Sequence, residues 1–383
     1  RQNQNNIEAS AQCYLKALAI KPDYYEALNN LGVSLYKGGQ LQEAIEKFME
    51  VQEKAPDYPD AYYNEGMARL ARGEFDRGWR HSEWRLKMPS FKIKGEAVPL
   101  TDQSLARGRT ILLHCEQGLG DSIQFIRYAA LVRELGARVV VFCPTPLVGL
   151  FGSVAGIDHL TDDVEQVPPC DHRVPTLSLP LLFNTDLETI PAPIPYIFPD
   201  PKLRQAMGER LAHCQGLKVG LVWHGNPGHS NDANRSMEPI WMSSLLQVEG
   251  VHFVNLQLGV SFVDQILFAG RPNWLDISHE LSTCSETAAL VSHLDLVISV
   301  DTAVAHLAGA LGRPVWILLP FVADWRWLQQ RSDSPWYPNA RLFRQTQRGD
   351  WATMMSTVRE KLAQVARGEL PPVWPLPETP GWE

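Results

Sequence analysis

The first ninety residues repeat themselves with a period of 34, and this periodicity constrains the fold more than any other feature of the sequence. In the central unit the apolar residues of 28–35 and of 44–51 each fall on one face of a helix, and Gly38 and Gly39 separate the two helices. A single helix pair cannot bury its apolar face alone, so units of this size stack into a solenoid. Eight positions recur at the spacing, six of them as identities: Tyr14/Phe48, Ala17/Val51, Pro22/Pro56, Asp23/Asp57, Tyr24/Tyr58, Ala27/Ala61, Gly32/Gly66 and Gly39/Gly73.

This segment resembles the tetratricopeptide repeat in its period and in the places given to small, aromatic and proline residues. We assign residues 1–92 to an all-α repeat domain. Its last unit departs from the pattern, because Glu65, Arg69 and Ser82 stand where apolar or aromatic residues are usual. Two interpretations stay open: a groove for a protein or peptide partner, or a helical cap that only stabilises the rest of the chain.

The charge and cysteine content exclude several classes of protein. A formal net charge of −8 without a long Lys/Arg run argues against sequence-independent nucleic-acid binding. No apolar run approaches the ~18 to 20 residues that span a bilayer. The cysteines are scattered without a CxxC pair, which suits reduced thiols better than disulfides or a zinc site. We therefore expect a soluble, cytoplasmic protein with no metal site.

A change of pattern marks the start of an α/β region near residue 105. An apolar strand at 110–115, a glycine-rich turn, a helix and a second strand at 137–143 form a βαβ unit, which opens a doubly wound sheet. We assign 105–200 to a first Rossmann-like half, and the proline-rich stretch 167–201 to the linker that ends it.

The glycine-rich turn precedes a helix amino terminus, a place where free N–H groups attract anions. Gly118 and Gly120 permit a tight backbone there, although Ile123 stands where the third glycine of GxGxxG would be. Asp121 has two interpretations: a functional carboxylate, or one half of a capping box with Gln124.

A second Rossmann-like half is predicted over 201–350, with strands near 217–222, 251–257, 295–300 and 314–319. The loop after its first strand is rich in Gly, Asn and His, and in it His224 and Asn226 accompany the cation Arg235. A guanidinium there is able to clamp a diphosphate in a bidentate manner, and the alternative is a mobile polar connection.

The segment from Asp301 to Trp316 is the most informative in the chain. Asp301 and Thr302 are good N-cap residues, and Ala303 begins a helix of small residues that can lie close to the sheet. Its amino-terminal amides then reach a bound phosphate. His306 comes one turn later and either faces the same site or is an ordinary buried helix histidine.

Two βα halves with these features resemble the GT-B glycosyltransferase architecture. GLGD at 118–121 and DTAVAHLAGALGRPVW at 301–316 are similar to motifs of glycosyltransferase family 9, the ADP-heptose:lipopolysaccharide heptosyltransferases, over roughly residues 108–345. The resemblance implies metal-independent, inverting transfer from a nucleotide-diphosphate sugar without a cofactor. It places Asp121 as the general base. It implies donor binding by Asp301, Thr302, Ala303 and His306. To these donor-binding candidates the turn adds Gly118 and Gly120, and the loop adds Asn226 and Arg235.

Departures from that family limit what is carried over. The loop at 224–236 has no lysine where heptosyltransferases carry one, and the amino-terminal repeats are foreign to them. Heptose specificity is therefore not carried over.

A tryptophan-rich stretch comes after the last predicted strand, at the sheet edge where open α/β folds bind ligands. We expect Trp325 and Trp327, with Gln124 and His224, to form a cleft wall, and plain packing between the halves is the alternative. The amphipathic segment 351–368 is predicted to be a helix that crosses back to the first half, within a terminal segment 351–383.

Three functions are compatible with these features. The leading one is a glycosyltransferase whose protein, peptide or glycan acceptor is selected by the repeats. A second is protein glycosylation of the O-linked GlcNAc transferase type, which also joins such repeats to a GT-B domain. The third is a non-catalytic repeat scaffold with a degenerate GT-B domain.

Overall fold

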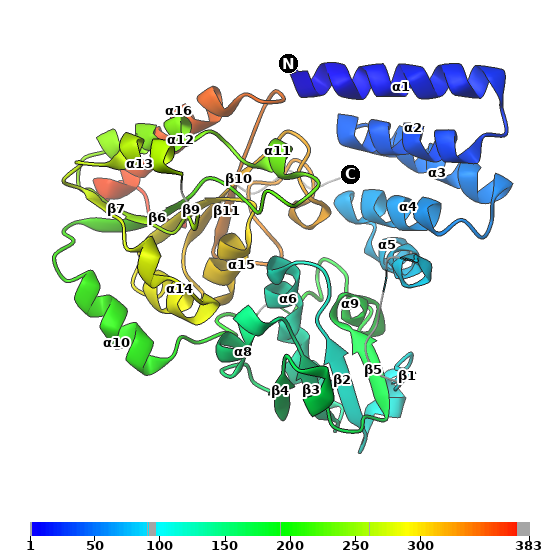
Figure 1. Ribbon diagram of the computed structural model, residues 1–383, viewed down its shortest axis with the longest axis horizontal. Coiled ribbons are helices and arrows are strands. Elements are labelled where there is room, and N and C mark those ends of the chain that lie inside the picture. The colour runs from blue at the N-terminus through cyan, green and yellow to red at the C-terminus, as the bar shows by residue number, and fades with distance from the viewer. Residues whose placement is uncertain (1, 90, 92–96, 192, 260, 374–383) are drawn as a thin grey trace.

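The computed structural model describes residues 2–89, 91, 97–191, 193–259 and 261–373. It places a stack of antiparallel helices beside two parallel sheets, and each sheet is accompanied by helices (Figure 1). This confirms the predicted class, an all-α repeat segment followed by two Rossmann-like units. None of the helices in these ranges is both long and apolar enough to cross a membrane.

The repeat helices begin and end where the 34-residue pattern predicts. Gly39 adopts a φ of +89° and ends the helix before it, so the predicted glycine break is confirmed. Phe48 packs directly against Gly32, where an added Cβ would lie 2.6 Å from the ring. The helices are α1 (Gln2–Ile20), α2 (Tyr25–Gly38), α3 (Leu41–Lys54), α4 (Pro59–Ala71) and α5 (Phe75–Ser82), followed by the 3-10 turn η1 (Glu83–Lys87).

The polar residues of the last repeat form a buried network. Glu65 is fully buried and accepts hydrogen bonds from Arg69 Nε at 2.6 Å and from Gln52 Nε2, and it lies 2.9 Å from His81 Nδ1. Hydrogen bonds and charge balance therefore replace apolar packing in this unit. Ser82 is buried beside it and donates to the Trp79 carbonyl at 2.7 Å.

The first sheet is entirely parallel, in the order β1-β5-β2-β3-β4. Its central strand β2 is almost fully buried, which explains the continuous apolar run. The edge strand β1 pairs with β5 ahead of residue 105, since a two-residue strand leaves no periodic signal. The strands are β1 (Val98–Pro99), β2 (Thr110–His114), β3 (Arg138–Phe142), β4 (His159–Thr161) and β5 (His172–Pro175); the α-helices between and after them are α6 (Leu119–Phe125), α7 (Ala129–Glu134), α8 (Thr145–Phe151) and α9 (Leu179–Leu182).

The linker is shorter than the predicted 167–201. Strand β5 and helix α9 lie within that range and belong to the first half, with prolines at the end of the strand and in the first turn of the helix, where they are tolerated. The connection is the segment after α9, which crosses to α10 (Pro201–Arg210), and on the way the Tyr196 N–H bonds the Ala310 carbonyl at 3.1 Å.

The second sheet is also parallel, in the order β11-β10-β9-β6-β7-β8, and it confirms the four predicted strands. Strands β7, β9 and β10 are buried along their whole length. The strands are β6 (Leu217–Val222), β7 (Val251–Asn255), β8 (Trp274–Leu275), β9 (Leu296–Val300), β10 (Val315–Leu319) and β11 (Ala340–Arg344); the α-helices are α11 (Asp232–Arg235), α12 (Pro239–Ser243), α13 (Phe262–Phe268), α14 (Cys284–Val291) and α15 (Ala303–Ala310).

The last helix, α16 (Trp351–Ala366), does not cross back to the first half as predicted. It packs on the second sheet, where Met355, Val358 and Leu362 join the core formed by Leu221 and Trp223. Its apolar stripe completes that face of the sheet, and amphipathicity alone did not indicate which face the stripe would cover.

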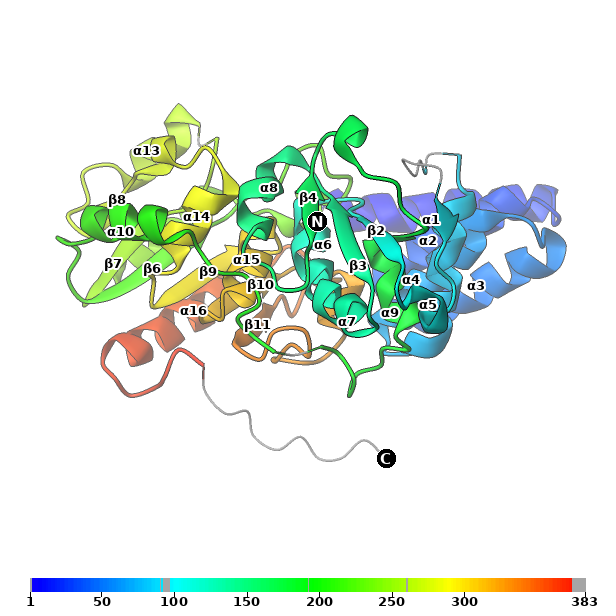
Figure 2. The same ribbon diagram turned by 90° about the horizontal axis from the view of Figure 1, so that it is seen from below.

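The repeats are not a separate module. Trp79 of α5 contacts Trp325 of the second half edge to face, with ring centroids 5.2 Å apart, and its indole N–H donates to the Thr185 carbonyl of the first half at 2.8 Å. One continuous apolar core contains residues of the repeats and of both halves. Seen from below, α5 lies beside α9 of the first half (Figure 2).

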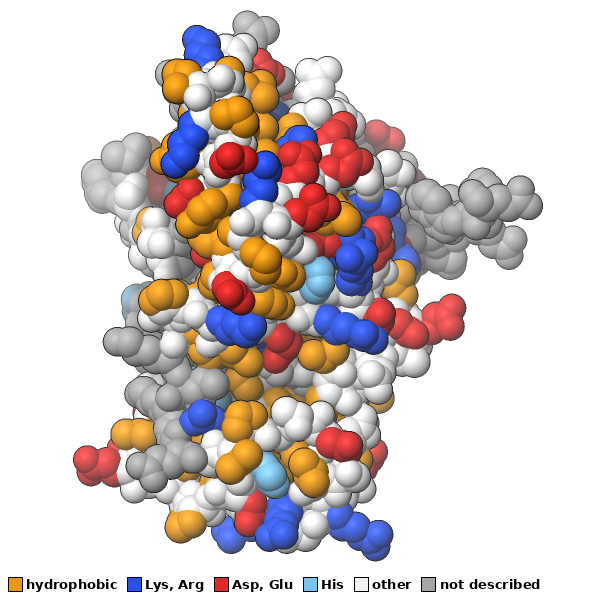
Figure 3. All heavy atoms as spheres, turned by 90° about the vertical axis from the view of Figure 1, so that its right-hand side faces the viewer, with side chains coloured by type: hydrophobic (Ala, Val, Ile, Leu, Met, Phe, Trp, Pro, Cys, Tyr) orange, Lys and Arg blue, Asp and Glu red, His pale blue; other side chains and the backbone are white. Residues whose placement is uncertain are grey.

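The outer face of the repeats carries mixed charge. Acidic, basic and apolar side chains are interspersed over it (Figure 3), so this view shows none of the continuous positive surface that phosphate backbones require.

Candidate functional site

Helix α6 starts three residues earlier than the predicted capping box. Gly118 is the N-cap, in an extended conformation, and Asp121 is at N3, where its Oδ2 accepts the Gly118 N–H at 3.0 Å. Asp121 therefore does cap the helix, but by reaching back to Gly118 and not by pairing with Gln124. The residue before the cap, Gln117, has a φ of +60°, a conformation that few non-glycine residues adopt.

The carboxylate of Asp121 also faces the second half. Arg326, in the 3-10 turn η8 (Trp325–Trp327) after β10, donates to Asp121 Oδ1 through Nη2. Its Nε donates to Gln124 Oε1 at 2.8 Å, and its Nη1 lies 2.8 Å from Asp324 Oδ1. Arg326 is buried, and burial alone would lower its pKa, but the adjacent Asp324 and Asp121 charges raise it. The guanidinium stays charged and joins the two halves.

Gly120 lets α6 approach α15 closely. A Cβ at this position would lie 2.8 Å from His306 Cδ2. The two motifs that resemble glycosyltransferase family 9, far apart in the sequence, are thus in direct contact.

His306 is buried one turn into α15. Its Nδ1 lies 2.9 Å from the Tyr337 hydroxyl, and its ring stacks on Trp327 with centroids 5.3 Å apart. Burial, together with the charges of Arg326, Arg127 and Arg235, holds the pKa of His306 well below its usual range. The imidazole is neutral at pH 7, so it serves as a hydrogen-bonding group and not as a cation.

Asp301 and Thr302 lie at the amino-terminal end of α15, as predicted. Burial and the Asp324 charge raise the pKa of Asp301 to about 6, although Arg326 opposes them. Thr302 uses its hydroxyl to pair with the Ser299 hydroxyl at 2.9 Å and not to cap the helix, so the first amides of α15, starting at Ala303, keep no side-chain cap.

Arg235 is brought to the same end of α15. Its Nη1 donates to the Asp301 carbonyl at 3.0 Å, and its Nε lies 3.3 Å from Asp232 Oδ1. Gly225 makes room for it, since a Cβ there would lie 2.5 Å from Arg235 Nη2. An acidic chain therefore places Arg235 and Arg326 beside this helix end, where both act on Asp301, and cations at a helix amino terminus favour an anionic ligand.

The other predicted loop residues shape the loop. Asn226 is exposed and accepts the Gly228 N–H at 2.9 Å, and the His224 N–H donates to Gln257 Oε1 at 2.8 Å. Neither side chain has a described contact with α15.

The predicted aromatic wall is part of the core. Trp325 is 6% exposed, and Trp327 and Gln124 are fully buried. The packing alternative describes them correctly, because Trp325 and Trp336 fill the seam against Phe125 and Trp79.

The repeats also contact this site, in addition to the two α/β halves. Buried Arg85 forms a two-pronged pair with Glu116, at 2.7 and 3.1 Å, just ahead of Gly118. Tyr63 of α4 hydrogen-bonds Gln117, and burial and the charges of Asp324 and Asp121 raise its pKa, which Arg85 opposes. Burial and the Asp324 charge likewise raise the pKa of Tyr36 on α2. Two tyrosines from the repeats therefore share the electrostatic environment of Asp324.

Sequence reasoning missed Asp324, Tyr36, Tyr63 and Arg127. Asp324 lies in the tryptophan-rich stretch, where aromatic residues dominate the pattern. Tyr36 and Tyr63 look like ordinary aromatic positions of a helical repeat. Arg127 looks like a polar position of an amphipathic helix, but it is buried and its Nη1 donates to the Trp336 carbonyl at 2.8 Å. Among the described residues, a group suited to a metal ion is made up of His213, Cys214 and His252, and it is remote from α15.

Family models match both the repeat segment and the second α/β half of the chain. The family model described as glycosyltransferase family 9 (heptosyltransferase) matches residues 282–319, which include the motif at Asp301. Models described as TPR repeat and tetratricopeptide repeat match residues 3–39 and 25–58.

Relatives are similar over most of the chain. Protein FlbA of Caulobacter vibrioides is 29% identical over an alignment of 441 positions, covering 94% of this chain and 71% of that protein. The crystal structure of a family 9 glycosyl transferase from Veillonella parvula superposes with a TM-score of 0.52 at 10% identity, covering 68% of this chain and 97% of that one. The E. coli ADP-heptose lps heptosyltransferase II gives 0.47 at 14% identity, covering 68% and 99%. The Veillonella structure shows that the two α/β halves share the fold of family 9 enzymes.

Proposed function

We propose that this chain, which joins tetratricopeptide repeats to a glycosyltransferase family 9 domain, transfers a sugar from a nucleotide-diphosphate donor to an acceptor hydroxyl, with inversion and without a metal. The observation that carries the proposal is the position of Asp121. Its carboxylate is held beside the amino-terminal end of α15, where arginines and unpaired helix amides gather.

The donor diphosphate binds at α15. The first amides of the helix donate to the phosphate oxygens, and the Thr302 hydroxyl turns from Ser299 to donate to them as well. Arg235 supplies the cation that the loop lysine supplies in heptosyltransferases. These fixed donors stabilise the charge that develops on the leaving diphosphate, so the step needs no metal ion.

Asp121 acts as the general base. The acceptor hydroxyl gives its proton to the Asp121 carboxylate while its oxygen attacks the anomeric carbon, and the bond from that carbon to the diphosphate oxygen breaks. One displacement at one carbon inverts its configuration. Arg326 keeps the carboxylate oriented until the proton arrives.

The acceptor enters between the repeats and the cleft. Tyr36 and Tyr63 lie on the repeat side of Asp324 and Asp121, and Arg85 holds the loop from which Asp121 projects. The repeats therefore lie beside the approach to Asp121. This role is additional to any groove that they form themselves. This arrangement suits a protein or peptide acceptor, whose flanking residues lie along the helices.

The first experiment identifies the donor. Thermal shift is measured with ADP-, UDP-, GDP-, dTDP- and CMP-sugars, since a donor at 100 times its Kd stabilises by about 2.7 kcal/mol. We expect sugars of one nucleotide class to raise the Tm of the protein. The protein should also consume them and release the free nucleotide. If no donor shifts the Tm and none is consumed in a cell extract, the glycosyltransferase assignment fails and a scaffold remains.

The second experiment identifies the acceptor class. The active donor, labelled in its sugar, is incubated with protein, peptide and glycan fractions of an extract. Label in protein supports selection by the repeats and the O-GlcNAc-transferase-like alternative, whereas label only in glycan overturns a protein acceptor.

We also propose a cytoplasmic location, because all six cysteines are free thiols.

A further inference from the structure

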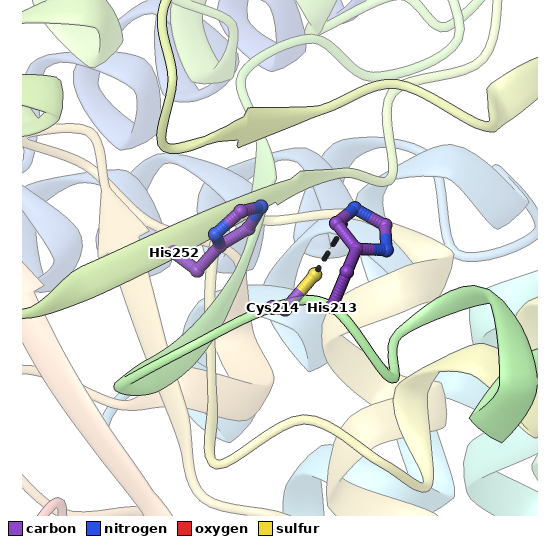
Figure 4. Close-up of side chains that lie close together, drawn as sticks. All are labelled: His213, Cys214 and His252. Carbon is purple, nitrogen blue, oxygen red and sulfur yellow. Dashed lines mark hydrogen bonds between the residues drawn. The ribbon is translucent and has the colours of Figure 1, made fainter.

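A compact group of metal-binding side chains lies at the edge of the second sheet opposite the candidate active site. His213 and Cys214 belong to the turn between α10 and β6, and His252 is the second residue of β7. Their ligand atoms all lie within 4.8 Å of one another, and Cys214 Sγ is 4.0 Å from His213 Nε2. The two imidazole rings flank the sulfur (Figure 4).

The spacing is close to what one tetrahedral ion requires. Zinc binds sulfur at about 2.3 Å and imidazole nitrogen at about 2.0 to 2.1 Å, which puts neighbouring ligand atoms about 3.5 Å apart. Closing the gap takes small side-chain rotations, and His213 is exposed and free to make them.

An unpaired buried nitrogen is the second observation. His252 is 9% exposed, and its Nε2 is buried without a hydrogen-bond partner. A buried polar atom in this state costs free energy unless something binds it.

Cys214 offers the sulfur ligand of this group, and Lys218 is the charged side chain that acts on it. The Lys218 ammonium lies 3.7 Å from Asp295 Oδ2, which offsets part of its repulsion of a cation. A bound ion displaces the thiol proton to solvent, as metal binding to cysteine does in general.

We propose that His213, Cys214 and His252 bind one zinc-class divalent transition-metal ion, with water as the fourth ligand. The ion ties the turn that enters the second half to the start of β7, next to the register pair Leu217 and Val251. The site lies at the amino-terminal ends of β6 and β7, whereas the donor site lies at the carboxyl ends of the strands. It takes no part in the transfer step and is structural.

Metal content and cobalt spectroscopy test the proposal on the full chain. After chelator treatment and titration with Zn²⁺, the wild type should retain one equivalent after desalting and show a raised Tm. With Co²⁺ it should show a thiolate-to-cobalt charge-transfer absorption in the near ultraviolet and the intense visible bands of tetrahedral cobalt.

Matched variants separate this site from chance binding. His213→Ala removes an exposed ligand and leaves the core intact, and Cys214→Ser removes the sulfur; both should lose the retained zinc, and Cys214→Ser should also lose the near-ultraviolet band. The control variants His279→Ala, at an exposed histidine, and Cys284→Ser should keep the retained zinc and the near-ultraviolet band. Retention of no zinc by the folded wild type, or cobalt spectra without a thiolate band, would overturn the proposal. So would equal metal loss in the control variants.

Discussion

Arg326 donates a hydrogen bond to the carboxylate of Asp121 across the seam between the two α/β halves. The other carboxylate oxygen accepts the Gly118 N–H within its own half. Asp121 is therefore fixed from both sides before any substrate binds, which is the preorganisation that proton transfer at a defined place requires.

Asp121→Asn should lower the rate of sugar transfer by roughly 10² to 10⁴, the usual contribution of a general base. Donor binding should change little, because α15 and Arg235 are untouched. Nucleotide release reports the rate, and the thermal shift with donor reports binding. Asp76→Asn, which removes an exposed carboxylate paired with Arg80 on α5, is the control and should behave as wild type. Wild-type turnover in Asp121→Asn would remove Asp121 as the base.

Arg85→Ala should destabilise the protein by about 3 to 5 kcal/mol, because it leaves Glu116 buried and uncompensated. Urea denaturation measures the loss. Arg80→Ala breaks an exposed pair and should cost less than about 1 kcal/mol. Replacing both partners, as in Arg85→Met with Glu116→Leu, should recover part of the stability. Equal effects of Arg85→Ala and Arg80→Ala would show that the repeats are not held by this pair.

Gly120→Ala should cost about 1 to 3 kcal/mol, because the new Cβ meets the buried His306 ring at 2.8 Å. His306 cannot move aside, since Tyr337 and Trp327 hold it. Transfer should fall as well, because α6 and α15 are pushed apart. Gly38→Ala is the matched control: its nearest neighbour is the Gln40 side chain at 3.5 Å, so it should be neutral or stabilising. A neutral Gly120→Ala variant would contradict the close approach.

Glu65 should make the repeats sensitive to acid. Burial alone would raise its pKa, but hydrogen bonds from His81, Gln52 and Arg69 lower the pKa to about 2. The folded pKa lies below the unfolded one, so the stabilisation is present above about pH 4.5 and is lost as the pH falls toward 2. The free energy of unfolding of wild type should exceed that of Glu65→Gln by on the order of 3 kcal/mol at pH 7, and the gap should narrow below pH 4.5.

Glu53→Gln, at an exposed glutamate, is the control for that comparison. Its free energy of unfolding should stay close to that of wild type at every pH. A gap between wild type and Glu65→Gln that stays constant down to pH 2 would contradict the role given to Glu65.

Local patterns predicted the features that depend on local chemistry. The 34-residue period located the helices, apolar runs located the central strands, and the motifs at 118–121 and 301–316 pointed to two elements that the fold brings into contact. Each of these depends on residues a few positions apart.

The missed features depend on pairs far apart in the sequence. The partners Arg326 and Asp121 are separated by 205 residues, and Arg85 and Glu116 meet only because the repeats fold onto the first half. Trp327 has the same composition signal whether it lines a cleft or fills a core, and α16 has an apolar stripe that fits either half. Only the tertiary arrangement distinguishes these outcomes.

The contact of Trp79 with Trp325 has a thermodynamic consequence. Trp325 is the neighbour of Arg326, so the repeats, the η8 turn and Asp121 form one mechanically connected unit. If a partner that binds the repeats changes the packing at Trp79 and thereby the affinity for the donor, the donor must change the affinity for that partner by the same factor. One coupling free energy would then describe both effects. It could be measured as the change in donor affinity caused by the partner, or as the change in partner affinity caused by the donor.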